Sequence, residues 1–373
     1  MGRSAESNAQ GQMKHIVCTV INDLSTDQRM HRIADTLVLA GYRVTLIGRQ
    51  LPDSRPLHPQ NFRQVRLCCF FHKGFLFYAE YNIRLWFWLL FHSFDIVNAV
   101  DLDTIAPGWL AARMKGKKIA YDAHEWFPYC PEIVVRPRVQ AFWKRIEAFF
   151  VPRVDAAYTV SRSIASALEQ TYGISFGLVR NMPVERTVRE QEKGRYILYQ
   201  GALNVGRGLE ELLEAMQHLD FQLYIAGKGD IKEQLKILIT KNNIKNKIFM
   251  LGQLSPEALR EVTDKAWLGV NLLQNLGLNY YYSLANKFFD YVQSGVPQIT
   301  MAFPEYQVMN REYEVALLIP DLSVETIVAA IKRMADDPEL YKTLSANCAL
   351  ASKEWSWSKE QEKLLEIYDR LAR

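Results

Sequence analysis

The sequence predicts an α/β protein with two consecutive domains, each built on a doubly wound parallel sheet. Its 373 residues are too many for one ordinary domain and suit two. Apolar runs typical of buried parallel strands alternate with helical patterns from residue 15 onward, and the alternation starts again at residue 195. The predicted parts are a disordered tail at 1–13, a first domain at 14–184, a linker at 185–194, a second domain at 195–354 and a last helix at 355–373.

The composition is that of a globular protein with ample material for two cores. Hydrophobic residues make up 49% of the chain and charged residues 23%. A net charge of +4 is small for this length and does not indicate a nucleic acid partner. The five cysteines show no metal-ligand spacing, which favours reduced thiols. The first residues are polar and lack the apolar region of a secretory signal, so a cytoplasmic location is expected.

The first domain begins with a β-α-β unit. A strand is predicted at 15–21, a helix ending at Gly41 follows, and a second strand lies at 43–48. The dinucleotide fingerprint Gly-x-Gly-x-x-Gly is absent after the first strand, which disfavours a nicotinamide or flavin site. Further strands are predicted at 95–100, 118–122 and 156–160, with helices at 104–114, 139–150 and 161–172.

Aromatic side chains are concentrated between Phe70 and Phe94, and the cations Lys73 and Arg84 lie among them. Rings mixed with cations suit the interface between lipid headgroups and acyl chains. Alternatively, most of these rings form core that packs a long helix against the sheet, and periodicity does not separate the two interpretations. The longest apolar run, 85–91, is far shorter than the roughly 20 residues that span a bilayer.

Polar side chains follow two predicted strands of the first domain. Asp101 and Asp103 come after one strand, and His124 and Glu125 come after the next. Ligands of open α/β sheets bind beyond the carboxyl ends of the strands, so all four are candidate site residues. A lone histidine is more often structural, and this alternative stays open for His124.

The second domain carries glycine-bearing loops at the ends of its strands. The strand 195–200 leads into Gly201–Gly208 and a helix at 209–216, which suits phosphate binding with Arg207 as the cation. The loop lacks the Lys-Ser/Thr ending of a P-loop, so ATP hydrolysis of that type is not expected. The strand 221–226 ends in Gly227–Gly229, where the chain could pass close to a flat base.

The stretch Tyr280–Pro297 is predicted to be a loop, a short helix and a stop. Ser283 is the expected N-cap, and Gly295 is the expected left-handed residue after the helix. Asn286 and Asp290 are four residues apart and share one face. Asp290 could accept hydrogen bonds from a ribose diol. The alternative is a solvated carboxylate on a capped surface helix.

These residues together resemble the group 1, or family 4, glycosyltransferases of the GT-B architecture. The resemblance covers nearly the whole chain, and its motifs occur in the family's order. The motifs are Ser25–Arg32, Tyr121–Glu125, Gly201–Gly208, Ser283–Tyr291 with Gly295–Pro297, and Trp355–Trp357.

The resemblance implies two Rossmann-like domains that face a cleft. The second domain would hold most of a nucleotide-sugar donor and the first domain the acceptor, and the last helix would cross back to the first domain. It also implies transfer with retention at the anomeric carbon and without a metal or other cofactor. By position, Asp290 matches the acid on the donor ribose, Arg207 the cation on the diphosphate and His124 the histidine near the reaction centre.

The remaining candidate site residues fall on both sides of the expected cleft. Donor contacts are expected at Gly201, Asn204, Gly206, Gly227, Lys228, Tyr282, Ser283, Leu284, Asn286 and Lys287. Acceptor-side residues are expected at Asp27, Arg29, Asp101, Asp103 and Glu125.

The sequence departs from the family pattern at two positions of the expected donor site. Tyr282 stands where the first acid of the usual pair is expected, and Ala202 stands where a cation is common. Residues 22–27 also replace the double-glycine loop after the first strand. These departures suggest a rearranged sugar pocket or weakened catalysis.

The predicted function is a retaining glycosyltransferase that uses a UDP- or GDP-type sugar donor. Its acceptor would be a glycan or lipid-linked molecule in surface polysaccharide biosynthesis, met at the inner face of the cell membrane through residues 70–94. A sugar-nucleotide epimerase of the same fold is an alternative that needs more carboxylates than the sequence supplies. A donor-binding but inactive subunit of a glycosylation complex is another, motivated by Tyr282 and Ala202.

Overall fold

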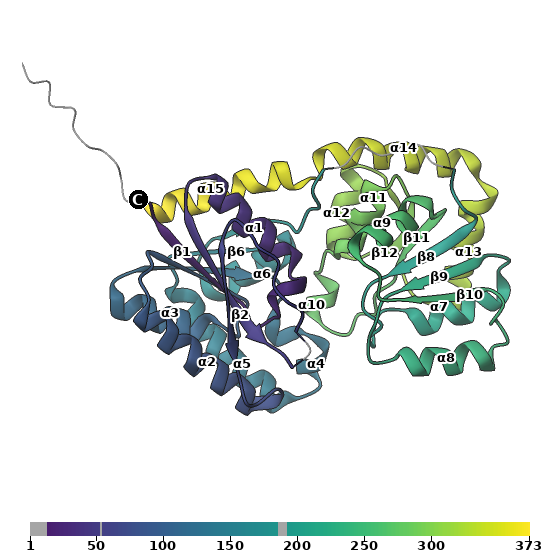
Figure 1. Cartoon of the computed structure of the whole chain (residues 1–373). Coiled ribbons are helices and arrows are strands. Elements are labelled where there is room, and N and C mark those ends of the chain that lie inside the picture. The colour runs from purple at the N-terminus through teal and green to yellow at the C-terminus, as the bar shows by residue number, and fades with distance from the viewer. Residues whose placement is uncertain (1–12, 53, 186–191) are drawn as a thin grey trace, which may run out of the picture.

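The computed structural model of the chain describes residues 13–52, 54–185 and 192–373. Residues 1–12 of the predicted tail and 186–191 of the predicted linker lie outside this range. Two parallel sheets lie side by side, and helices cover both faces of each sheet (Figure 1). The predicted fold class, two Rossmann-like α/β domains, is confirmed.

The first sheet has seven strands in the order β3-β2-β1-β4-β5-β6-β7, all parallel. The chain order reverses between β1 and β4, and ligands of open α/β sheets bind at such a switch point. The edge strand β3 was not predicted, because its residues are half-exposed and form no apolar run. The bounds are β1 (His15–Thr19), β2 (Arg43–Gln50), β3 (Arg63–Cys68), β4 (Ile96–Val100), β5 (Lys118–Ala123), β6 (Ala156–Thr159) and β7 (Phe176–Leu178).

Helices cover both faces of the first sheet. Helices α2, α3, α5 and α6 share one apolar core with it, and α1 belongs to a second core. Apolar residues of α2 that point to the sheet, including Phe77 and Leu85, are buried. The bounds are α1 (Gln28–Leu39), α2 (Gly74–Phe91), α3 (Ile105–Lys115), α4 (Pro131–Val134), α5 (Pro137–Phe150) and α6 (Arg162–Tyr172).

The second sheet has six parallel strands in the order β10-β9-β8-β11-β12-β13. Its strands are β8 (Tyr196–Gln200), β9 (Gln222–Ala226), β10 (Ile248–Gly252), β11 (Leu268–Asn271), β12 (Gln298–Met301) and β13 (Ala316–Ile319). Its helices are α7 (Leu209–Ala215), α8 (Lys232–Lys241), α9 (Pro256–Lys265), α10 (Leu278–Tyr281), α11 (Asn286–Gln293), α12 (Pro304–Glu312), α13 (Val324–Asp336) and α14 (Pro338–Glu354). Helices α8, α10 and α12 and strand β13 were not predicted.

The last helix, α15 (Trp357–Ala372), lies against the first domain beside α1 (Figure 1). The backbone N–H of Trp357 donates to the carbonyl of Pro183 at 2.7 Å, and its indole N–H donates to Thr36 at 2.9 Å. Further along the helix, the hydroxyl groups of Tyr368 and Tyr158 are 3.2 Å apart. The C-terminal segment therefore ties the second domain to the first.

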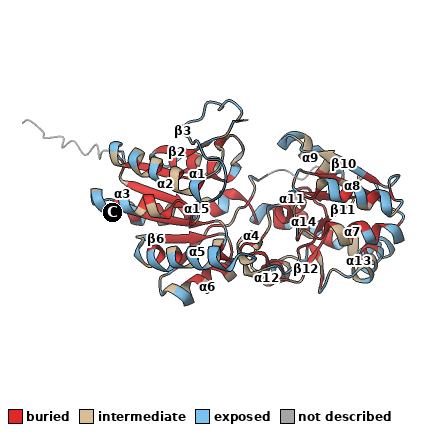
Figure 2. Cartoon of the chain, turned by 90° about the horizontal axis from the view of Figure 1, so that it is seen from below, coloured by how far each residue is buried: buried red, intermediate tan, exposed pale blue. Residues whose placement is uncertain are grey.

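Helix α10 of the second domain also packs against the first domain. Its residue Leu278 and the following Tyr282 pack against the core of the first domain. Asn279 is buried, accepts a hydrogen bond from the Trp126 amide at 2.9 Å and donates one to the Cys130 sulfur at 3.3 Å. Figure 2 shows the buried strands inside each domain and the segments α4 and α12 near the junction.

A second contact between the domains comes from Glu305. This residue lies in the first turn of α12. Its carboxylate accepts hydrogen bonds from both the backbone N–H and the hydroxyl of Ser163, each at 2.7 Å. Glu305, which is buried, thus caps the start of α6 across the junction through these hydrogen bonds.

The structure corrects the predicted start of α11. The N-cap position is Ala285, and the Ser283 hydroxyl instead donates to the carbonyl of Tyr280 at 2.8 Å. The prediction was wrong because α10 ends just before Ser283, which closes that turn. The predicted end is confirmed: Gly295 has φ 63°, and the Val296 amide returns to the Tyr291 carbonyl at 2.9 Å.

Candidate active site

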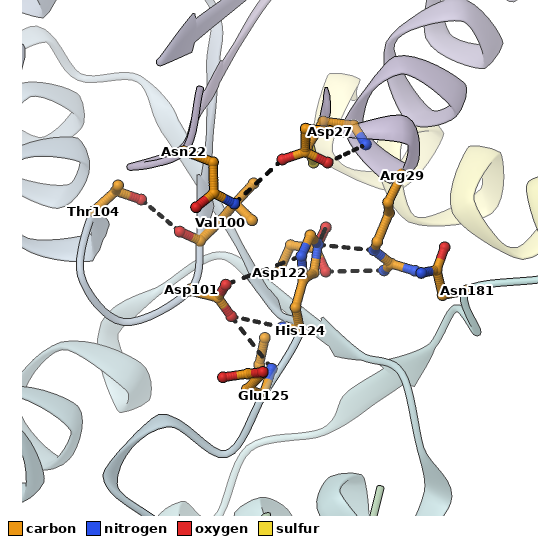
Figure 3. Close-up of polar contacts among 12 residues, drawn as sticks. Asn22, Asp27, Arg29, Val100, Asp101, Thr104, Asp122, His124, Glu125 and Asn181 are labelled. Atoms are coloured by element: carbon orange, nitrogen blue, oxygen red, sulfur yellow. Dashed lines mark hydrogen bonds and ion pairs between the residues drawn. The ribbon is translucent and has the colours of Figure 1, made fainter. Parts of the chain in front are cut away.

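The first half of the site is built on a buried ion pair behind His124. Asp122 lies near the end of β5 and Arg29 lies in the first turn of α1, and both side chains are buried. The Arg29 Nη2 atom is 3.2 Å from Asp122 Oδ1. The His124 Nε2 atom lies 2.8 Å from both Asp122 Oδ2 and Arg29 Nε (Figure 3). Two charged neighbours therefore hold one edge of the imidazole.

This arrangement controls the proton on His124. An ionised Asp122 only accepts hydrogen bonds and so pairs with a protonated Nε2, whereas Arg29 Nε only donates and pairs with an unprotonated Nε2. Burial is the largest single influence on His124 and would lower its pKa, but the carboxylates of Asp122 and Asp101 together outweigh burial and Arg29, so the pKa of His124 is raised. Burial would raise the pKa of Asp122, but His124 and Arg29 hold it below its ordinary value.

Asp101 fixes the loop that carries His124. Its carboxylate accepts hydrogen bonds from the backbone N–H groups of His124 at 2.8 Å and of Glu125 at 3.3 Å (Figure 3). The Asp101 backbone is left-handed, with φ 58°, which costs free energy in a residue other than glycine. Such strain concentrates at functional sites, and here it allows the carboxylate to reach the neighbouring loop.

The two other acidic candidates differ in exposure. Asp103 is buried, and its Oδ1 atom has no hydrogen-bond partner among the described residues. Burial and then the neighbouring Asp101 raise the pKa of Asp103 well above its ordinary value. Glu125 is exposed and accepts a hydrogen bond from the Cys130 thiol at 3.1 Å. Burial raises the pKa of both Asp101 and Asp103, and the Glu125 carboxylate lies close enough to both of them to raise their pKa values further.

The remaining acceptor-side candidates have supporting contacts. Asp27 is the N-cap of α1 and accepts a hydrogen bond from the Met30 amide at 3.0 Å. Arg29 also donates to the carbonyl of Val179 at 3.2 Å. With its guanidinium on Asp122 and His124, Arg29 acts on the site through His124. A direct contact of Asp27 or Arg29 with an acceptor stays a prediction.

The second half of the site contains two cations beside the glycine loop Gly201–Gly208. Lys287 is 7% exposed, its ammonium nitrogen lies 3.8 Å from the centre of the Tyr199 ring, and it has no hydrogen-bond partner in the described part of the chain. The Arg207 guanidinium lies 4.7 Å from the centre of the Tyr280 ring. Burial and then Arg207 lower the pKa of Lys287 well below its ordinary value.

Close packing explains the glycines of this half-site. A Cβ atom at Gly201 would lie 3.3 Å from the Lys287 ammonium, and one at Gly227 would overlap the Gly201 carbonyl. A Cβ at Gly206 would meet Leu276 at 2.6 Å. The loop after β9 thus packs directly on the loop after β8, which accounts for Gly227 without a bound base.

Two further donor candidates lie where these loops meet. Asn204 is half-buried, and its side-chain oxygen would lie only 2.5 Å from a Cβ atom placed on Gly229. Lys228 is exposed, and its carbonyl accepts a hydrogen bond from the Leu203 amide at 2.9 Å. The structure therefore places Lys228 at the surface and Asn204 inside the loop contact.

Asp290 lies where the two domains approach each other. Its carboxylate accepts a hydrogen bond from Gln200 at 2.9 Å. Asn286, one turn earlier, accepts a hydrogen bond from Asn181 of the first domain at 2.7 Å. Arg32 of α1 also donates to Asn181 and interacts electrostatically with Asp290. Burial and then the nearby Arg29 lower the pKa of Arg32 to about 10.

Tyr282 and Leu284 have structural surroundings. The Tyr282 ring stacks on Trp126 of the first domain, with centroids 6.3 Å apart and planes inclined by 14°. Leu284 is buried in the core of the second domain. These surroundings therefore give neither side chain the role of a polar ligand beside the Lys287 and Arg207 cations.

Sequence reasoning missed Asp122, Arg32 and Gln200. Asp122 stands in the motif Tyr121–Glu125 but reads as the last residue of a buried strand. Arg32 lies three residues after Arg29, on the same face of α1. That spacing was the one available signal, and it gains meaning only once Asp290 is known to lie opposite.

Family comparisons agree with this architecture. Residues 27–182 match the profile described as Glycosyltransferase Family 4, and residues 184–350 match the profile described as Glycosyl transferases group 1. The two adjacent matches cover most of the chain, and the chain belongs to the group 1 glycosyltransferases of the GT-B fold. No group of three or more His, Cys, Asp or Glu side chains among the described residues is arranged to hold a metal ion.

Individual relatives are distant. The alpha-D-kanosaminyltransferase of Streptomyces kanamyceticus is 23% identical over 178 residues, which are 46% of this chain and 45% of that protein. The chain thus matches less than half the length of this curated relative. The sucrose-phosphate synthase of Thermosynechococcus elongatus superposes with a TM-score of 0.79 at 16% identity, covering 96% of this chain and 99% of that one. Anabaena HepE in complex with UDP and glucose superposes with a TM-score of 0.76 at 12% identity, covering 96% and 100%. These structures share the fold.

Proposed function

We propose that the protein is a retaining, metal-independent glycosyltransferase that moves a sugar from a UDP-type donor to a glycan or lipid-linked acceptor. The observation that carries this proposal is the pair of cations, Arg207 and Lys287, at a glycine loop whose neighbouring helix presents Asp290. A diphosphate satisfies both cations, and a ribose diol satisfies a carboxylate. The structures of HepE with UDP and with UDP-glucose favour UDP over GDP as the nucleotide to test first.

The proposed chemistry uses charge in place of a metal. The departing nucleoside diphosphate gains negative charge as its bond to the anomeric carbon breaks, and Arg207 and Lys287 stabilise that charge. The β-phosphate oxygen that leaves takes the proton of the attacking acceptor hydroxyl on the same face of the sugar, so configuration is retained. His124, held by Asp122 and Arg29, faces the donor sugar from the first domain.

The proposal is tested by turnover and by Arg207→Ala. Purified protein incubated with UDP-sugars and a glycan or lipid extract should release UDP only when acceptor is present. Arg207→Ala should lower the rate by about 2–4 kcal/mol of transition-state stabilisation. Equal rates in variant and wild type would remove that role. Donor binding without turnover for any acceptor would favour an inactive subunit, and acceptor-independent conversion of the sugar would favour an epimerase.

An exposed apolar face on α2 supports a lipid-linked acceptor. Phe75 is 71% exposed and Phe91 81%, and Phe70 just before the helix is 83% exposed. Burial of these exposed rings in a lipid interface would be favourable, and contiguous exposed apolar surface of this kind marks interaction sites. Lys73, at the N-cap of α2, is also exposed and would attract anionic headgroups. No helix in the described part of the chain has the length and apolar character needed to cross a membrane.

Vesicle sedimentation tests this membrane contact. The protein should pellet with vesicles containing phosphatidylglycerol more than with phosphatidylcholine vesicles. Phe91→Ser should reduce the bound fraction about tenfold, because a buried phenylalanine contributes roughly 1.5–3 kcal/mol. Phe249→Ser, at a half-exposed ring of the second domain, is the matched control. Equal binding of wild type and Phe91→Ser would exclude this face.

A further inference from the structure

A cavity in the second domain lies outside the donor half-site. Its volume is about 580 Å³, within the roughly 300–1,000 Å³ of small-molecule sites. Residues that follow β11, β12 and β13 form its walls, so it opens at the carboxyl edge of the second sheet, on the β13 side. Arg207, Lys287 and Asp290, all described residues, do not line it.

The chemistry of the cavity disfavours anions. Leu273, Met301 and Phe303 are buried and supply its apolar floor. Its polar lining consists of Glu211, Gln274, Asn275, Tyr281, Gln307 and Asp321. Among the described residues that line it there is no lysine, arginine or histidine. Two carboxylates, with no cation among the described residues of the lining, repel phosphate, which disfavours a nucleotide as the occupant.

The polar atoms of the cavity that are not used in hydrogen bonds within the protein are mainly hydrogen-bond acceptors. The Gln274 amide N–H donates to Glu211 Oε1 at 2.5 Å, and the Gln307 amide N–H donates to the Ala302 carbonyl at 2.8 Å. These bonds orient both amides and leave their side-chain oxygens as acceptors. Glu211 Oε2 is buried and has no hydrogen-bond partner among the described residues. A ligand rich in hydroxyl groups would satisfy these oxygens.

We propose that this cavity binds an uncharged sugar unit. Hydroxyl groups donate to Glu211 and the glutamine oxygens, while the rings of Tyr281 and Phe303, with centroids 5.1 Å apart, pack on the C–H face of a pyranose. Tyr281 precedes Tyr282, whose ring stacks on Trp126, so the cavity lies next to the junction of the domains. The acceptor glycan or its product supplies the sugar. That source rests on the proposed transferase function, whereas sugar binding itself does not.

The test is calorimetric titration of the full chain with two neutral trisaccharides, maltotriose and cellotriose. We expect millimolar binding of at least one of them. Glu211→Gln removes an acceptor charge with little change of shape, and Gln307→Met removes an acceptor oxygen. Each variant should weaken binding about tenfold while UDP affinity, measured on the same sample, stays that of the wild type.

Three results would overturn the proposal. In the first, the wild type binds neither trisaccharide. In the second, the wild type and both cavity variants bind equally. In the third, binding is lost in His124→Ala but kept in Glu211→Gln. The last result would move the sugar to the candidate active site. Trisaccharide binding with no response to UDP or any UDP-sugar would instead contradict the transferase proposal and leave the sugar site standing.

Discussion

Replacing Lys287 with methionine should separate donor binding from folding stability. An unpaired buried donor costs about 1–3 kcal/mol, and the Tyr199 ring, 3.8 Å from the Lys287 ammonium, offsets about 0.5–2 kcal/mol of that cost. Methionine fills a similar volume without the charge. The free energy of unfolding of Lys287→Met should therefore differ from the wild-type value by no more than about 1 kcal/mol, as measured by urea unfolding.

Donor binding should respond much more strongly. Truncating one partner of a buried, hydrogen-bonded charge pair costs about 2–5 kcal/mol, so UDP should bind Lys287→Met at least about 30-fold more weakly in a calorimetric titration. Lys332→Met, which removes an exposed lysine of α13, is the matched control. A folded Lys287→Met protein with wild-type UDP affinity would refute a role for Lys287 in the diphosphate site.

The lowered pKa of Lys287 predicts the direction in which UDP affinity changes with pH. Burial and Arg207 disfavour the charged ammonium in the free protein, and a bound diphosphate would favour it again. UDP binding should therefore take up a proton, and affinity should fall as pH rises through the free-protein pKa of Lys287. Titrations in buffers of different ionisation enthalpy measure this uptake. Uptake that persists in Lys287→Met would assign it to another group.

Two further substitutions test the carboxylates. Asp290→Ala should weaken UDP binding at least about tenfold but leave pyrophosphate binding intact, because Asp290 is proposed to hold the ribose; unchanged UDP affinity would remove it from the site. Asp122→Asn should cost about 3–5 kcal/mol of stability, because it leaves the Arg29 charge buried and unpaired. It should also lower the pKa of His124, which NMR titration of the ring measures. In the wild type, the stability linked to His124 is fully present below the unfolded pKa and is lost as pH rises through the raised folded pKa. A variant with unchanged pKa would exclude Asp122 as the cause.

The sequence predicts the parts of this fold that have a strong local signal. Buried strands such as β1 and β4 are apolar runs, and their order along the chain is enough to place His124 and Asp101 at one edge of a sheet. The edge strand β3 has no such run and was missed. Which rings of α2 are exposed could not be predicted from the sequence either. Almost every residue of the helix is apolar, so no periodic pattern marks the face that meets the sheet.

The candidate site likewise has parts that the sequence predicts and parts that only the structure shows. The glycine loop and Asp290 stand in recognisable motifs, but the pairing of Arg29 with Asp122 joins residues 93 positions apart, and that of Asn181 with Asn286 spans 105. Such contacts depend on how two sheets and two domains are arranged. Sequence therefore indicates which residue types are present at the strand ends, and the structure shows which of them support others.

The surroundings of Tyr282 explain why an acid is absent there. Its ring packs on the core of the first domain and stacks on Trp126, one turn after Asn279 bonds the Trp126 amide. A carboxylate at that place would face the Trp126 indole and other apolar groups, and burying a charge against them is costly. We infer that α10 and Tyr282 hold the two half-sites together. In the proposed mechanism, the donor sugar would then be oriented by groups of the first domain, chiefly His124, and by the cations Arg207 and Lys287 of the second domain.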